Sequence, residues 1–213
     1  MTVTDGSTNW VAGKLSHEHV SSVRALENNL IELDIEEMGS VLVAVMSLRV
    51  AGLANIPTAA RRPDVEFILN IPKDALFDGD LINFAYNVPV GLGGIGDLLR
   101  AVNQKDLRGY ICPERRFIFR ALSQHDAVSR VEMLNNNTFL IHRHTMAAYQ
   151  VLAINEYEIT ADVIRDNIQR FGRSRTILVN NPNGRVTPEA IDAARSAGVR
   201  IVDVRQLLGA LNS

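Results

Sequence analysis

Residues 17–29 read HEHVSSVRALENN, and residues 125–137 read HDAVSRVEMLNNN, which is nearly the same stretch repeated 108 positions later. The two stretches share seven of their thirteen residues, whereas unrelated stretches of this length would share about one. Further along, Asn70-x-Pro72 recurs as Asn180-x-Pro182, and apolar residues of 82–101 recur in order at 191–210. The sequence therefore predicts an internal duplication, with a first repeat over residues 1–107 and a second over residues 108–213.

The first half of each repeat has the pattern of an antiparallel β-meander. Residues 20–27 and 128–134 alternate apolar and polar side chains, as a half-buried strand does. The asparagines that follow, at 28–29 and 135–137, tolerate positive φ angles and suit a hairpin turn. We expect a strand before this hairpin strand and two after it, at 10–16, 30–35 and 41–47 in the first repeat and at 117–123, 138–144 and 149–155 in the second.

The second half of each repeat has the pattern of alternating strands and helices. In the second repeat, Thr160 is the expected N-cap of a helix that ends at Gly172, and Thr187-Pro188 begins the next helix. Short apolar strands are expected at 176–180 and 199–202, and a closing helix at 205–211. The predicted fold class is α/β: two tandem repeats, each an antiparallel β-hairpin or meander followed by β-α-β-α, pseudo-twofold related and joined by a linker at 105–116.

The composition is that of a globular protein, with 46% hydrophobic and 22% charged residues. No apolar run reaches the roughly 18 residues that a membrane span needs, and residues 1–7 lack a signal pattern, so we expect a cytoplasmic protein without membrane association. Residues 1–107 hold 8 basic and 14 acidic residues, a net charge of −6, whereas residues 108–213 hold 14 and 10, a net charge of +4. Opposite charges either help the two halves pack or leave an arginine-rich face for an anionic partner. A homo-oligomer is a further open possibility.

The end of the second repeat resembles the C-terminal part of Mrr-type restriction-endonuclease-like domains. The resemblance is carried by Thr187-Pro188-Glu189-Ala190, by Gly198-Val199-x-Ile201-Val202-Asp203 and by Leu207-Leu208. It implies chemistry that needs an aspartate on one strand and a carboxylate-x-lysine pair on the next, to hold a metal that activates water. The equivalent strand here reads Ala153-Ile154-Asn155, and in the first repeat Ala44-Val45-Met46. The resemblance therefore implies a degenerate, non-cutting relative.

A glycine-rich stretch in the first repeat is a candidate ligand site. Gly91, Gly93, Gly94 and Gly96 precede an expected helix with the spacing of a dinucleotide-binding loop, in which backbone N–H groups approach a phosphate. Asp97 at the helix start would repel a phosphate. The matching positions of the second repeat include Arg200, Val202 and Arg205, so the fold does not require glycine there. The glycines are either a local function or divergence between the repeats.

Two turns that follow buried strands form a second candidate, because ligands of α/β sheets bind beyond the carboxyl ends of the strands. The chemistry of turns also explains these residue types without a ligand. The candidate residues in these turns are Asn70, Lys73, Asn181, Asn183 and Gly184.

Two charged clusters complete the candidates. Cations are favoured at the end of a helix, and such a group can also contact phosphates; the cluster here is Arg165, Arg170, Arg173 and Arg175. His142 and His144 share a face of an expected strand, and their aligned counterparts are Glu32 and Asp34. Pseudo-twofold packing would bring these four together as a metal site, and exposed polar residues on a strand are the simpler interpretation. We predict no cofactor and favour no metal.

Three functions remain open from the sequence. The first is a binding or assembly protein without catalytic activity, made of two degenerate nuclease-like units, whose partner is nucleic acid, contacted through the second repeat, or another protein. The second is an enzyme that binds a nucleotide or phosphorylated ligand at the glycine-rich stretch and the strand-end turns. The third, ranked lowest, is a metal-dependent nuclease with relocated ligands.

Overall fold

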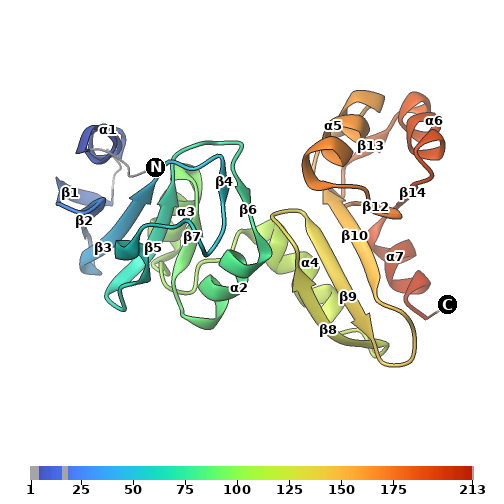
Figure 1. Cartoon of the computed structure of the whole chain (residues 1–213), viewed down its shortest axis with the longest axis horizontal. Helices are drawn as coiled ribbons and strands as arrows, with labels where there is room; N and C mark the ends of the chain where they lie inside the picture. Colours follow the sequence, from blue (N-terminus) through green and yellow to red (C-terminus); the bar gives the residue numbers. More distant parts are fainter. Residues whose placement is uncertain (1–4, 16–18, 213) are drawn as a thin grey trace. The chain divides into compact units, whose positions relative to one another are not determined.

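The computed structural model describes residues 5–15 and 19–212, and the chain divides into two compact units, Met1–Cys112 and Pro113–Ser213 (Figure 1). The division falls five residues beyond the predicted boundary. The predicted linker is largely structured, because Leu107 and Tyr110 are buried in the core of the first unit and Pro113 begins a helix.

The first unit is built on a five-stranded sheet with the order β1-β2-β3-β5-β7. The first three of these strands are antiparallel, and the last two continue parallel to β3. A short parallel pair, β4 and β6, lies outside this sheet. The strands are β1 (Val20–Ala25), β2 (Leu30–Ile35), β3 (Gly39–Met46), β4 (Val50–Ala51), β5 (Val65–Asn70), β6 (Leu76–Phe77) and β7 (Gly91–Gly93). The helices are α1 (Asp5–Lys14), the 3-10 helix η1 (Thr58–Arg61), α2 (Gly79–Asn87) and α3 (Ile95–Gln104).

The second unit repeats this plan, with the sheet order β14-β12-β10-β9-β8 and a short parallel pair of β11 and β13. Its strands β8, β9 and β10 are antiparallel, and β12 and β14 continue parallel to β10. The strands are β8 (Val128–Met133), β9 (Thr138–Arg143), β10 (Tyr149–Ile154), β11 (Glu158–Ile159), β12 (Thr176–Val179), β13 (Arg185–Val186) and β14 (Arg200–Val202). The helices are α4 (Pro113–Ser123), α5 (Ala161–Phe171), α6 (Pro188–Ser196) and α7 (Val204–Ala210).

The duplication extends to individual backbone hydrogen bonds. Leu26 N donates to Leu30 O in the first unit, and Leu134 N donates to Thr138 O in the second. The bond from Val45 N to Asn29 O likewise has its counterpart in the bond from Ala153 N to Asn137 O. The prediction of two tandem α/β units is therefore confirmed.

The predicted first strand of each repeat is wrong, because both segments are helical. Residues 10–14 belong to α1 and residues 117–123 to α4, while Ser16 lies outside the described residues. In α4, a proline and an acidic residue open the helix, and Ile118 and Leu122, one turn apart, are its buried residues. This spacing places both apolar side chains on one helical face, and the same holds for Val11 and Leu15 at α1.

The predicted pairing of Asn70 with Asn180 is shifted by one residue. In the sheet, Asn70 lies beside Met46, whereas the residue beside the matching Ile154 is Val179. The register therefore makes Val179 the counterpart of Asn70. The Asn-x-Pro motif belongs to the turn, whereas the buried side chains before the turn fix the register of the sheet. Matching the motifs therefore misplaces the strand by one residue.

The helix caps predicted in the second repeat are confirmed. The Thr160 hydroxyl accepts a hydrogen bond from Val163 N at the start of α5, and the Thr187 hydroxyl accepts one from Ala190 N at the start of α6. Gly172 ends α5 with a φ of 86°, a conformation that glycine adopts without strain. Among the described residues, no helix is long and apolar enough to cross a membrane.

Candidate functional site

The second unit contains a groove of about 1330 Å³ at the carboxyl ends of its parallel strands. Asn155 follows β10, Asn180 and Asn181 follow β12, and Asp203 follows β14, and all four line the groove. Every residue that lines it lies between Pro113 and Gln206, so the groove belongs to the second unit. Its volume exceeds the roughly 300–1,000 Å³ typical of sites for small ligands. The carboxyl ends of the strands are where α/β sheets bind their ligands.

Much of the groove surface is apolar. The groove is lined by Ile201 and Val202 of the edge strand β14 and by Val199, which precedes that strand. Ala194 of α6 also lines it. Phe117 of α4 and Ile191 of α6 also line it, and these large side chains are 54% and 45% exposed. Exposed apolar side chains gathered in one concave place are typical of a binding surface.

Three arginines give the groove its positive charge. Arg195 forms an ion pair with Asp192, with 2.8 Å between Nη1 and Oδ1. Arg200 and Arg205 also line the groove, and their side chains make no hydrogen bond or ion pair with any other described residue. The acidic residues of the lining are Glu114 and Asp203, and Asp203 is engaged because its Oδ1 accepts from Gln206 N at 2.7 Å.

The first unit shows that the fold does not need these arginines. Gly91 occupies the place of Arg200, since both begin the edge strand and pair with equivalent positions of the neighbouring strand. Gly94 and Asp203 are the N-caps of α3 and α7, which makes Gly96 the counterpart of Arg205. Two positions that are glycine in one unit are thus arginines without partners in the other.

Asn180 lines the groove and carries a buried polar atom. The residue is 8% exposed, and its Oδ1 has no hydrogen-bond partner among the described residues. A buried amide oxygen without a donor is unfavourable, and such groups usually bond to a ligand or to water. The oxygen is itself buried, so it can accept from a donor in the groove only if the Asn180 side chain turns toward the groove.

Packing accounts for two of the four glycines, Gly91 and Gly93. Gly91 and Gly93 form β7 itself, Gly94 is the N-cap of α3 and Gly96 lies in that helix. A Cβ atom at Gly91 would overlap the Phe67 ring and the Leu107 carbonyl oxygen, and one at Gly93 would lie 2.5 Å from the Asp97 side chain. Asp97 Oδ2 accepts a hydrogen bond from Gly94 N at 3.1 Å, so a carboxylate holds the position that a phosphate would need.

The strand-end turns divide into a structural member and a member of the groove. Asn70 is fully buried and clamps Leu48, whose N donates to Oδ1 and whose O accepts from Nδ2, both at 2.9 Å. Lys73 is exposed in the turn beyond it. Asn181 and Gly184 line the groove, whereas Asn183 does not, although its N donates to Asn181 Oδ1 at 2.9 Å.

The predicted arginine cluster lies around the end of α5 and contributes nothing to the groove lining. Arg165 forms an ion pair with Asp162 at 2.8 Å, and the Arg170 guanidinium lies over the Phe171 ring. Arg173 and Arg175 are exposed in the segment before β12. Sequence reasoning missed Arg200 and Arg205 as site residues, although comparison of the repeats had singled out both positions.

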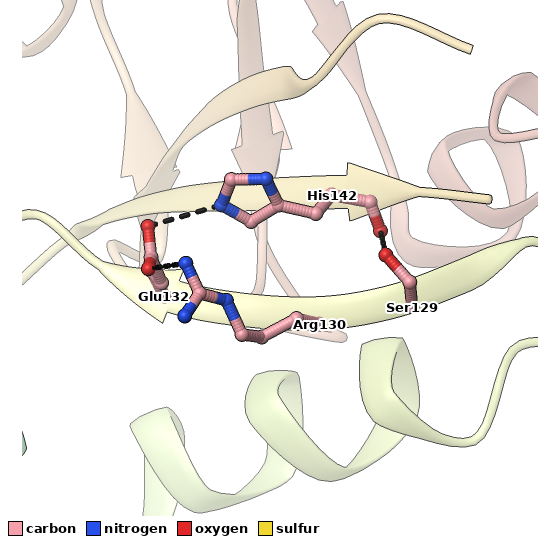
Figure 2. A network of polar contacts seen from close by, with 4 residues as sticks. All are labelled: Ser129, Arg130, Glu132 and His142. Atoms are coloured by element: carbon pink, nitrogen blue, oxygen red, sulfur yellow. Dashed lines mark hydrogen bonds and ion pairs between the residues drawn. The ribbon is translucent and has the colours of Figure 1, made fainter. Parts of the chain in front are cut away.

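Of the predicted histidine pair, His142 is part of a cross-strand network (Figure 2). His142 Nε2 lies 3.0 Å from Glu132 Oε2, and Glu132 also forms an ion pair with Arg130. The Ser129 hydroxyl donates to His142 O at 3.1 Å. Within residues 5–15 and 19–212, no three or more His, Cys, Asp or Glu side chains are placed to hold a metal ion. The other three residues of the predicted metal site are His144, Glu32 and Asp34. His144 is exposed, and Glu32 and Asp34 lie in the first unit, where Glu32 pairs with Arg24.

This network predicts a small dependence of stability on pH. The hydrogen bond with His142 lowers the pKa of Glu132 below its ordinary value, burial opposes this and the charge of Arg130 adds to it. The pKa of Glu132 is lower in the folded state than in the unfolded state, so ionised Glu132 stabilises the fold at pH values above its pKa in the unfolded chain. This stabilisation is lost as the pH falls through its pKa in the folded protein. We expect Glu132→Gln to cost at most about 1 kcal/mol at pH 7, because surface pairs are weak. In denaturant titrations, the difference in the free energy of unfolding between the variant and wild type should shrink below about pH 5.

The matched control is Glu156→Gln, which removes an exposed carboxylate from a loop of the same unit. It should leave the pH dependence of the unfolding midpoint unchanged. A Glu132→Gln protein whose stability difference grows in acid would contradict the prediction.

No protein-family model matches the chain, and no curated protein or solved structure matches it either. The function is therefore inferred from the chemistry of the groove.

Proposed function

We propose that the protein is a non-catalytic binding protein whose second unit binds a nucleotide in its groove, either a free nucleotide or one unit of a nucleic-acid strand. The observation that carries this proposal is the pair of groove arginines, Arg200 and Arg205, that lack partners among the described residues. Their counterparts in the first unit are Gly91 and Gly96, so packing of the fold does not account for them.

The two arginines supply the phosphate end of the site. A guanidinium group presents several N–H donors in a plane and binds phosphate oxygens through charge-assisted hydrogen bonds. Arg200 begins the edge strand and Arg205 lies in the first turn of α7. Asp203, between them in sequence, accepts from a backbone N–H, which reduces its repulsion of an anion.

The apolar surface and the amides supply the base end. Phe117 offers an exposed aromatic face in the groove, on which a base can stack at a gain of about 1–3 kcal/mol. The unpaired Oδ1 of Asn180 needs a hydrogen-bond donor. A phosphate at neutral pH offers few donors, whereas nucleobases carry N–H groups. A ligand with both parts therefore satisfies the groove better than a phosphate alone.

The lining favours binding over catalysis. It contains no serine, threonine, tyrosine, cysteine, histidine or lysine, which are the usual nucleophiles and general bases apart from carboxylates. Of its two carboxylates, Asp203 caps a helix. We also propose a nuclease-like origin for the two units. In such a nuclease, metal-binding carboxylates would be expected on the strand that here reads Ala153-Ile154 and is followed by Asn155, and these residues are not carboxylates.

The proposal predicts that the groove arginines control affinity. We expect Arg200→Ala combined with Arg205→Ala to weaken nucleotide binding at least about tenfold, because each loses a charge-assisted hydrogen bond. Isothermal titration with the four ribonucleoside monophosphates, and fluorescence anisotropy with labelled single-stranded and duplex oligonucleotides over a salt series, measure this. The matched control is Arg165→Ala combined with Arg170→Ala, which removes the same charge outside the groove.

The two sources of the nucleotide give different results. A free nucleotide ligand binds as a monophosphate, whereas a strand ligand binds as an oligonucleotide with a steep dependence on salt. Loss of binding in the control variant alone would move the site to the end of α5. Absence of binding to all of these probes at low salt would overturn the proposal.

A further inference from the structure

The N-termini of α3 and α7 share one capping hydrogen bond. In the first unit, Gly94 N donates to Asp97 Oδ2, and in the second, Asp203 N donates to Gln206 Oε1, both at 3.1 Å. Asp97 and Gln206 are therefore equivalent in role as well as in position. Each uses one polar atom for the cap and has a second polar atom left over.

In the first unit, the chain itself satisfies the second atom. Asp97 Oδ1 accepts a hydrogen bond from the Tyr110 hydroxyl at 2.7 Å. Tyr110 is buried, and its ring centroid lies 6.0 Å from that of Phe67. The Leu107 carbonyl covers Gly91 from the same segment. The Tyr110 ring thus lies beside Asp97, while Phe67 and Leu107 lie beside Gly91.

In the second unit, the corresponding positions line the groove instead. Arg200 and Gln206 are the counterparts of Gly91 and Asp97, and both belong to the lining. The atom of Gln206 left over from the cap is the Nε2 amide, which has no hydrogen-bond partner in the described part of the chain. In the second unit, the space beside Arg200 and Gln206 is therefore part of the groove, and the Gln206 Nε2 donor borders it.

We infer that this space is the base subsite of the groove: the nucleobase ring binds beside Gln206, where the Tyr110 ring lies in the first unit. Gln206 Nε2 donates to an acceptor on the edge of the ring, as Asp97 Oδ1 accepts from the edge of Tyr110. The inference rests on the proposed function and goes beyond it, because it makes Gln206 the residue that reads the base. It also limits each chain to one bound nucleotide, since Tyr110 closes the equivalent space.

The test is Gln206→Glu, which keeps an oxygen to accept from Asp203 N and so keeps the cap of α7. It replaces the free donor with an acceptor. We expect the affinity for the ribonucleoside monophosphates to fall about tenfold, measured by isothermal titration. Ribose 5-phosphate, which has no base, should lose much less and reports the effect of the added charge alone. Thermal unfolding checks that the variant is folded.

The results separate this inference from the proposed function. Equal losses for the monophosphates and for ribose 5-phosphate, or two nucleotides bound per wild-type chain, would overturn the base subsite while nucleotide binding itself stands. Failure of the wild-type protein to bind any monophosphate or oligonucleotide would overturn both. One nucleotide per chain together with a selective loss in Gln206→Glu supports the inference.

Discussion

Replacing Gly91 with alanine is expected to destabilise the first unit by about 3 kcal/mol, the upper range for overpacking a tight core. The new Cβ would overlap the ring of Phe67, a fully buried residue, and the carbonyl oxygen of Leu107. The carbonyl is backbone and cannot rotate away, so the segment that carries Tyr110 must shift. Urea titration followed by circular dichroism measures the loss as a lower unfolding midpoint.

The matched control is Gly96→Ala, five residues along the chain from Gly91. A Cβ at Gly96 would meet no atom within 4 Å, and the residue lies inside α3. Alanine is favoured over glycine in a helix by up to about 1 kcal/mol, so this variant should be neutral or stabilising. Equal effects of the two substitutions would contradict the packing role of Gly91 and revive a ligand role for the glycine-rich stretch.

The sequence predicts the meander well and its neighbours less well, for a physical reason. Residues 131–133 of β8 and 139–142 of β9 alternate buried and less buried side chains, and the turn between these strands carries asparagine, so local pattern and structure agree there. By contrast, β7 consists of Gly91, Leu92 and Gly93, and glycine is unfavourable in strands. The segment is a strand because it pairs with β5, and Phe67 and Leu107 leave room only for glycine at position 91.

The candidate site was predictable only in part. Asn181 and Gly184 follow a buried strand, and the rule about strand ends places them correctly at the groove. Phe117 and Gln206 reach the same groove from the two ends of the second unit's sequence, and no local motif links them. The useful signal was the difference between the repeats, since a position that changes from glycine to arginine without loss of the fold is free to serve a ligand.

Two asparagines with the same apparent motif are expected to respond in opposite ways. Asn70→Ala should destabilise the first unit by about 2–3 kcal/mol, because two hydrogen bonds to Leu48 are lost and its backbone N–H and C=O are left unpaired. Asn180→Ala should leave stability unchanged or raise it slightly, because the unpaired buried Oδ1 disappears. Urea titration of both variants against wild type measures the difference.

The effect on binding should be reversed. Asn180 lines the groove, so Asn180→Ala removes the amide that we propose turns toward the nucleobase, and should weaken nucleotide binding by about fivefold to tenfold. Asn70 lies in the other unit, and Asn70→Ala should bind nucleotides normally in conditions where it is folded. A strongly destabilised Asn180→Ala protein would show that Asn180 has a structural partner, which would remove the main reason for expecting a donor-bearing ligand.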